Sequence, residues 1–280
     1  MKSQNKAVWD GSDIENAKKY DEYTKRFSVY SEIGKNLIDL AGVKEGMTVA
    51  DLGCGTGVAT EKLLTAVGAS GKVYAVDSSP AMLEIARSRI KAPHVVFICS
   101  FAEELDLVLK EKVDCVVSSA AFWQMDMNKT LEVVEKILKN GGNFAFNMPA
   151  QFLGPLTTTL PKKEVVGNLP QLMQQAMRDI AVREYKIPNY IYMQKKLTFK
   201  DVEKILESNS FAVVRRESIT SQRTIEDIYE FNKIPIITET LLSPLDYEKR
   251  MDVLNKAYVF FNKNKKHLDT WTCFIVEKRS

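Results

Sequence analysis

The feature that most constrains this chain is an apolar run that ends in a glycine-rich turn, MTVADLGCGTG at residues 47–57. A helix-like segment follows at 58–67. A second apolar run at 72–76 then leads through Ser79-Pro80 into another helix-like segment, and proline suits the first turn of a helix. Strands that alternate with helices pair in parallel and are joined by right-handed crossovers. The sequence therefore predicts a doubly wound α/β fold.

The later apolar runs set the number of strands and the domain boundaries. Together with the first two runs they predict a Rossmann-like, mostly parallel, seven-stranded sheet, the further strands being 95–99, 113–117, 143–147, 212–217 and 270–277. The stretch from Ser12 to Leu40 is helix-like throughout. We assign 1–45 to an N-terminal helical lid segment, 46–149, 197–220 and 269–280 to the core, and 150–196 and 221–268 to two helical cap insertions.

Both predicted insertions leave the sheet at the same edge. They follow strands five and six, whose carboxyl ends face the place where open α/β sheets bind their ligands. Turns at the opposite edge, such as 70–71 and 140–142, are short. We expect a helical cap that excludes water around a small acceptor and blocks a folded macromolecule. The alternative is that most apolar side chains of the cap form its own core or a dimer contact.

The glycine turn and two acids indicate the kind of ligand. The pattern of the turn is GxGxG, in which Val58 replaces the third glycine of the dinucleotide fingerprint. Asp51 closes the strand before the turn, and Asp77 ends the next strand. Two carboxylates suit a ligand with a cationic end and a ribose diol, whereas they repel a pyrophosphate. The alternatives are a solvated acid at Asp77 and a tight turn that binds nothing.

The segments VADLGCGTG and VYAVDSSPAML together resemble the first two motifs of class I S-adenosylmethionine-dependent methyltransferases. The resemblance covers about residues 45–148. It implies that the glycine loop wraps the methionine part of S-adenosyl-L-methionine and that Asp77 accepts hydrogen bonds from both ribose hydroxyls. Ser100 stands where an acid commonly receives the adenine amino group. The cofactor-binding residues that the resemblance suggests are Tyr20, Tyr30, Asp51, Gly53, Cys54, Gly55, Gly57, Asp77, Ser78, Met82, Ser100, Phe101, Ala102 and Ser118.

In this family the segment after the fourth strand lies between donor and acceptor. Here it reads SSAAFWQM from Ser118, without the Pro-Pro pair and acid of DNA amino-methylases. We predict that Phe122, Trp123 and Gln124 contact the substrate, because aromatic rings can stack a flat acceptor or face a sulfonium; core packing is the alternative. The chain offers no convincing general base, so the catalytic residue stays unknown.

Composition excludes several other classes of function. The 39 basic and 36 acidic residues are interspersed, which argues against a nucleic-acid partner. No stretch reaches the roughly 20 apolar residues that span a bilayer, and the start of the chain lacks a signal peptide, so we expect a soluble, cytoplasmic protein without a membrane partner. The four cysteines form no CxxC pair and are expected to be buried free thiols.

We therefore predict methyl transfer from S-adenosyl-L-methionine to a small, partly apolar or aromatic metabolite, with no metal required. Whether nitrogen, oxygen or carbon is methylated is left open, as is a homodimer. Two other functions are compatible with the same fold. One is a reaction other than methyl transfer, such as cyclisation or elimination, and the other is methylation of RNA or protein.

Overall fold

A seven-stranded sheet in the order β3-β2-β1-β4-β5-β7-β6 organises the computed structural model, which describes residues 14–150, 153, 168–188 and 197–279. Neighbours among β1 to β5 pair in parallel, and β7 runs antiparallel to both β5 and β6. This confirms the predicted mostly parallel, Rossmann-like sheet. The strands are β1 (Thr48–Leu52), β2 (Lys72–Asp77), β3 (Val95–Cys99), β4 (Val113–Ser118), β5 (Leu138–Pro149), β6 (Phe211–Thr224) and β7 (Lys266–Lys278).

Helices cover both faces of the sheet. One face packs against α2 (Val29–Leu40), α3 (Val58–Val67) and α4 (Pro80–Arg89). The other face packs against η1 (Ala102–Glu104), α5 (Leu105–Val108), η2 (Phe122–Gln124), α6 (Met127–Ile137) and α8 (Phe199–Ser208). Strands that are buried on both faces are apolar at nearly every position, which explains why the sequence reveals them.

The N-terminal segment forms two helices in place of one continuous stretch. α1 (Ile14–Arg26) ends just before Phe27, and α2 begins at Val29. The break separates two packing partners. Ala17 of α1 packs on Ala81 and Met82 of α4, whereas α2 packs on the sheet. Apolar spacing alone does not reveal this change of direction.

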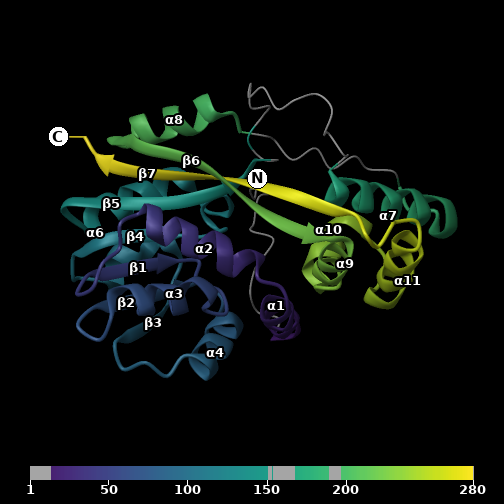
Figure 1. Cartoon of the computed structure of the whole chain (residues 1–280), viewed down its shortest axis with the longest axis horizontal. Coiled ribbons are helices and arrows are strands. Elements are labelled where there is room, and N and C mark those ends of the chain that lie inside the picture. Colours follow the sequence, from purple (N-terminus) through teal and green to yellow (C-terminus); the bar gives the residue numbers. More distant parts are fainter. Residues whose placement is uncertain (1–13, 151–152, 154–167, 189–196, 280) are drawn as a thin grey trace.

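The cap forms a separate helical lobe with its own hydrophobic core. Its helices are α7 (Leu169–Tyr185), which follows β5, and α9 (Ile225–Asn232), α10 (Pro235–Leu242) and α11 (Tyr247–Tyr258), which follow β6. Figure 1 shows these helices gathered at the far end of β6 and β7. Met173 and Met177 pack with Leu254 in the core of the lobe. The predicted cap after strands five and six is thus confirmed, and most of its apolar side chains pack on one another.

Three expectations about the strands were wrong. β5 begins at Leu138, so residues 140–142, expected as a short turn, lie within the strand. β6 and β7 are also longer than predicted, because the polar residues up to Thr224 and from Lys266 continue the ladder in register. The cap therefore starts at the end of a ribbon and not at residue 221. Cys99 is exposed, because β3 is an edge strand, whereas Cys54, Cys115 and Cys273 are buried as expected.

Within the described ranges, no helix is long and apolar enough to cross a membrane. The same ranges hold no group of three or more His, Cys, Asp or Glu side chains that could bind a metal ion.

Candidate donor and acceptor sites

The glycine loop between β1 and α3 is shaped by close packing. Gly53, Gly55 and Gly57 have φ values of +69°, +55° and +90°, a region that favours glycine. A Cβ atom on Gly53 would lie 2.5 Å from the Cβ of Ala121, and one on Gly57 would lie 2.7 Å from Cδ1 of Ile90. The loop is therefore pressed against the segment after β4 on one side and the end of α4 on the other.

Asp77 at the end of β2 is tied to this loop. Its Oδ2 accepts a hydrogen bond from the Gly55 N–H at 2.8 Å, and its Oδ1 accepts one from the Ser79 N–H at 2.8 Å. Burial raises the pKa of Asp77, and these two N–H groups partly oppose the shift. Asp77 is half-buried and its bond from Ser79 holds the Ser-Pro turn, while its contact with a ribose stays a prediction. Each carboxylate oxygen keeps lone pairs that could accept bonds from a ribose diol.

Asp51 at the end of β1 is buried and only half satisfied. Its Oδ2 accepts a hydrogen bond from Thr60 Oγ1 at 2.7 Å, while its Oδ1 has no partner in the part of the chain that the structure describes. Burial raises the pKa of Asp51 to about 7. A buried carboxylate oxygen without a partner is costly. A cationic group with N–H donors, such as the ammonium end of an amino acid, would fit it.

Two tyrosines from the N-terminal helices lie above the loop. A ring carbon of Tyr20 is 3.8 Å from where a Cβ of Gly55 would be, and the rings of Tyr20 and Tyr30 have centroids 5.7 Å apart. Burial raises the pKa of both phenols, so both hydroxyls keep their protons at neutral pH. Either hydroxyl can donate a hydrogen bond to a carboxylate.

The residues expected on the adenine side differ in how exposed their side chains are. Ser100 is adjacent to Asp77, since its N–H donates to the Asp77 carbonyl oxygen at 3.1 Å, and its Oγ donates to the Phe101 carbonyl oxygen. Phe101 is 59% exposed and Ser78 is exposed, so both could contact a ligand. Met82 is buried against α1.

Three further residues serve the fold through their side chains. Ser118 Oγ donates to the Leu52 carbonyl oxygen at 3.0 Å, which joins β4 to β1. Cys54 packs in a core cluster beneath the loop, and Ala102 is buried in the main core. Because these side chains are buried in the fold, any contact of the three residues with a cofactor would be made by their backbone atoms.

On the acceptor side the structure adds a residue to the predicted ones. Phe122 is fully buried, with its ring centroid 4.6 Å from that of Phe146, so its ring packs in the main core and its role as a substrate contact stays a prediction. Trp123 and Gln124 are half-buried. The ring of Trp123 lies 5.8 Å from the ring of Trp271 on β7. Sequence reasoning missed Trp271 because nearly 150 residues separate the two tryptophans.

Aromatic rings form a continuous row at this end of the sheet. From Tyr20 the row passes to Tyr30 and then to Trp271, with centroids 6.2 Å apart in the second step, and it ends at Trp123. The row begins at the glycine loop and ends at the segment that follows β4. Phe231 of α9 adds a ring from the cap, 6.3 Å from Tyr30.

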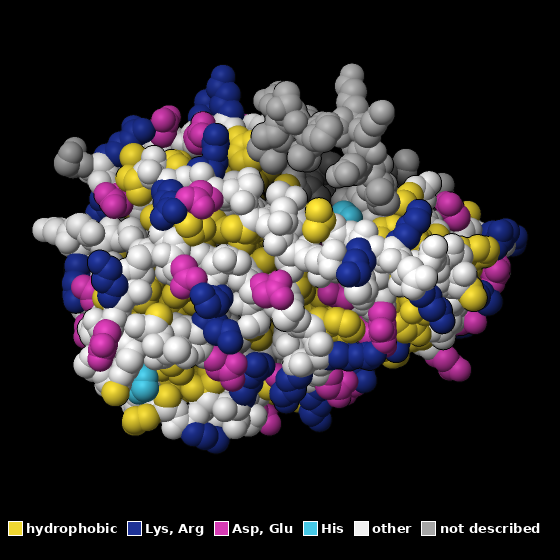
Figure 2. All heavy atoms as spheres, viewed as in Figure 1, with side chains coloured by type: hydrophobic (Ala, Val, Ile, Leu, Met, Phe, Trp, Pro, Cys, Tyr) yellow, Lys and Arg dark blue, Asp and Glu magenta, His cyan; other side chains and the backbone are white. Residues whose placement is uncertain are grey.

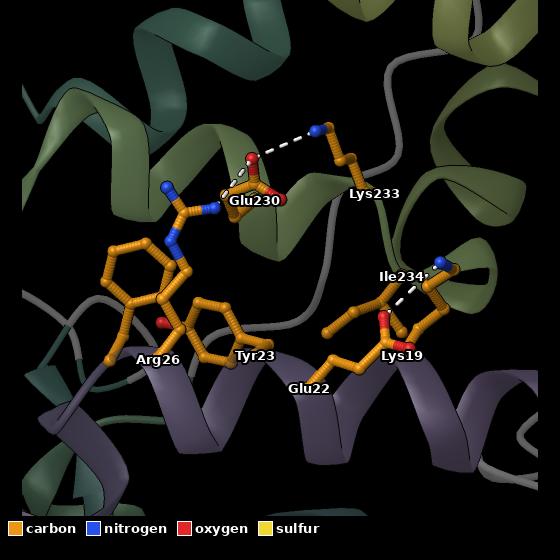
Figure 3. Close-up of a pocket in the computed structure, with 8 residues that line it drawn as sticks. Lys19, Glu22, Tyr23, Arg26, Glu230, Lys233 and Ile234 are labelled. Carbon is orange, nitrogen blue, oxygen red and sulfur yellow. Dashed lines mark hydrogen bonds and ion pairs between the residues drawn. The ribbon is translucent and has the colours of Figure 1, made fainter.

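A polar network joins α1 to the cap beside this row. Tyr23 OH donates to Asp227 Oδ1 at 2.7 Å, and Arg223 donates to both groups. Figure 3 shows the adjoining pocket of about 200 Å³, where Arg26 and Lys233 both face Glu230. The Lys19, Arg26 and Lys233 side chains of this pocket are each paired with a glutamate. The pocket is therefore a polar contact region between α1 and the cap.

Comparisons with known proteins agree with this geometry. Residues 49–142 match the family described as "Methyltransferase domain". The chain is 31% identical over 214 residues to malonyl-[acyl-carrier protein] O-methyltransferase of Acetivibrio thermocellus, a match that covers 73% of this chain and 68% of that protein. It is 30% identical over 153 residues to the ubiquinone/menaquinone biosynthesis C-methyltransferase UbiE of Escherichia coli, which covers 52% of this chain and 59% of the relative.

A solved structure gives the same fold. The S-adenosylmethionine-dependent methyltransferase of Thiobacillus denitrificans, crystallised with S-adenosyl-L-homocysteine, has a TM-score of 0.53 at 18% identity, covering 89% of this chain and 91% of that one. The sheet order, the glycine loop with its two acids and the extent of the sequence match lead to one conclusion: the chain belongs to the class I S-adenosylmethionine-dependent methyltransferases.

Proposed function

We propose that this methyltransferase acts on a small, partly aromatic or apolar acceptor that binds between the glycine loop and the cap. The observation that carries the proposal is the row of rings from Tyr20 to Trp123. Flat aromatic faces stack planar molecules and attract a sulfonium cation. We expect the cap and α1 to exclude water from this region and to keep a folded macromolecule out of it.

The residues at the glycine loop fit the cofactor. Asp51 supplies a buried oxygen for an ammonium group, Asp77 supplies oxygens for a ribose, and Gly53, Gly55 and Gly57 add no side chains of their own between a ligand and the loop backbone. When bound, S-adenosyl-L-methionine supplies a methyl group on a sulfonium, already activated for displacement. The protein's own contribution is then to hold donor and acceptor in line.

Neither histidine is placed to act as a general base. His94 precedes the edge strand β3, where its carbonyl oxygen accepts a bond from the Val73 N–H. His267 lies on the ribbon, with Nε2 3.2 Å from Asp269 Oδ1. Alignment and removal of water can account for much of the rate enhancement without a base.

The surface supports a small acceptor over a nucleic acid. Figure 2 shows basic and acidic side chains mixed over the core and the cap, without a continuous basic stripe on that face. Many charged side chains of the described residues form ion pairs, as Lys35 does with Asp39 and Arg216 does with Glu203.

The test is to incubate the protein with methyl-labelled donor and a metabolite extract. We expect label to appear in small molecules, and we expect S-adenosyl-L-homocysteine to bind in calorimetry. Binding without any label transfer would favour a cyclisation or elimination on the same fold. Label in RNA or protein fractions alone would refute the proposed acceptor class.

A further inference from the structure

We propose that the acceptor presents an oxygen, as a carbonyl, carboxylate or phenolate, to two N–H groups that the protein leaves unpaired. These are Nδ2 of Asn147 on β5 and Nε1 of Trp271 on β7, both buried and without a hydrogen-bond partner among the described residues. The inference rests on the proposed function, because it concerns the acceptor of the same site.

The orientation of the Asn147 amide is fixed by its other end. Oδ1 accepts a hydrogen bond from the Ala120 N–H at 2.7 Å. A flipped amide would set its NH₂ group against that N–H, so the nitrogen must point the other way. Asn147 therefore presents a donor whose direction is set by the backbone after β4.

Ala120 connects this amide to the donor loop. Its φ of +58° is uncommon for a residue other than glycine. Sparsely populated backbone conformations of this kind often occur at functional sites. The next residue, Ala121, is the one that Gly53 approaches so closely. Asn147 is thus linked to the loop that would hold the methyl donor through two contacts: its hydrogen bond from Ala120 and the close approach of Ala121 to Gly53.

The second donor lies on the same face of the neighbouring strand. Asn147 pairs with Cys273 in the antiparallel ladder, and Trp271 is two residues from Cys273. Because side chains alternate along a strand, the amide and the indole are diagonal neighbours, with backbones about 7–8 Å apart. The indole lies between the rings of Tyr30 and Trp123. Both donors thus border the row of rings.

A single ligand group accounts for both unpaired donors. Buried N–H groups are nearly always paired, because leaving one unpaired loses the hydrogen bond it made with water. An oxygen with two lone pairs can accept both hydrogen bonds, whereas an ammonium group has no lone pair to offer. The arrangement thus selects planar acceptors that carry an oxygen and disfavours amines. The two relatives described above are an O- and a C-methyltransferase by name.

The two donors are covered by protein in this structure. An acceptor therefore reaches them only after the surrounding side chains have moved apart. Since neither donor titrates in the physiological range, the selection for oxygen should not depend on pH through these two groups.

The experiment compares matched planar probes on the full chain saturated with S-adenosyl-L-homocysteine. Benzoate and acetophenone carry the oxygen, and benzylamine carries an ammonium in its place. Ligand-observed NMR titrations give the affinity of each probe. We expect the oxygen probes to bind and benzylamine to bind at least ten-fold more weakly.

Two variants remove one donor each. Trp271→Phe deletes the indole N–H, and Asn147→Asp keeps the oxygen that faces Ala120 while replacing the amide nitrogen. Each should weaken benzoate binding at least ten-fold, because one hydrogen bond to a charged group is lost and Asn147→Asp also sets a carboxylate against the anionic probe, with S-adenosyl-L-homocysteine affinity unchanged. Asn143→Asp is the matched control, because Asn143 lies on the same face of β5 and its Nδ2 already donates to the Ala41 carbonyl oxygen.

The outcomes are distinguishable. Equal affinity for benzylamine and benzoate, unchanged benzoate affinity in both donor variants, an equal loss in the control or no binding of any oxygen probe would each overturn the inference. Failure of S-adenosyl-L-homocysteine to bind the wild-type chain would instead count against the proposed function itself. Thermal unfolding of each variant shows whether it is folded before its affinities are compared.

Discussion

Replacing Gly53 by alanine tests whether the glycine loop is shaped by contact with the segment after β4. Gly42 provides a matched control, because both glycines have a φ of +69° but only Gly53 is crowded. A Cβ on Gly53 would meet Ala121 at 2.5 Å and Met125 at 3.1 Å, whereas a Cβ on Gly42 would meet nothing within 4 Å.

The expected magnitudes follow from these contacts. Both substitutions incur the left-handed backbone penalty, roughly 1–2 kcal/mol. Gly53→Ala adds the cost of forcing the loop away from the Ala121 and Met125 side chains, about 1–3 kcal/mol by analogy with overpacked cores. Urea unfolding should therefore show a larger loss of unfolding free energy for Gly53→Ala, at an unchanged denaturant slope.

Donor binding should separate the two variants further. Gly53→Ala shifts the loop and should weaken S-adenosyl-L-homocysteine binding at least ten-fold in calorimetry, while Gly42→Ala, away from the site, keeps wild-type affinity. If both variants lost equal stability and both bound normally, the contact between the loop and Ala121 would not shape the site.

Four further substitutions address single groups. Asp77→Ala should weaken donor binding by about 2 kcal/mol, within the range for hydrogen bonds to a charged group, and an unchanged calorimetric affinity would rule out its ribose role. The folded pKa of Asp51, about 7, lies above the ordinary value, about 3.9, so its burial lowers the free energy of unfolding as pH rises from about 4 to 7. Asp51→Asn should remove that part of the decline in urea titrations, and a pH profile identical to wild type would contradict the shift. Trp123→Ala should lower turnover with nearly unchanged donor affinity; equal losses of both would place the ring in the core. Tyr23→Phe removes a bond to Asp227 and should cost about 1–3 kcal/mol of stability, with faster hydrogen exchange in α9, whereas unchanged exchange would mean that the network does not hold the cap.

The centre of the sheet could be predicted from sequence because β1, β2, β4 and β5 are buried on both faces along most of their length, and the connections from β1 to β5 are local. The run that ends at Asp51 and the turn that follows it determine a strand, a loop and a helix within a few residues. The cap could be placed for the same reason, since its position follows from the direction of the parallel strands. Its extent could not, because polar residues up to Thr224 continue a ribbon through backbone pairing alone.

The acceptor side was harder to predict because it depends on contacts distant in sequence. Phe122 and Trp123 are adjacent and aromatic, yet one turns into the core and the other toward Trp271. That choice is made by the surrounding strands. The role of Asn147 was equally hidden, since an asparagine in an apolar strand shows neither that its oxygen meets Ala120 nor that its nitrogen lacks a partner.

Helix α1 couples the glycine loop to the cap, because it contacts both. Tyr20 rests on the glycine loop and Tyr23, on the same side of the helix, bonds to the cap. A helix of 13 residues, about 20 Å long, moves as one body, so lifting it from one contact disturbs the other. Donor product and methylated acceptor would then leave in the same opening event. We expect steady-state turnover to be set by the frequency of that opening, with methyl transfer in each closed interval the faster step.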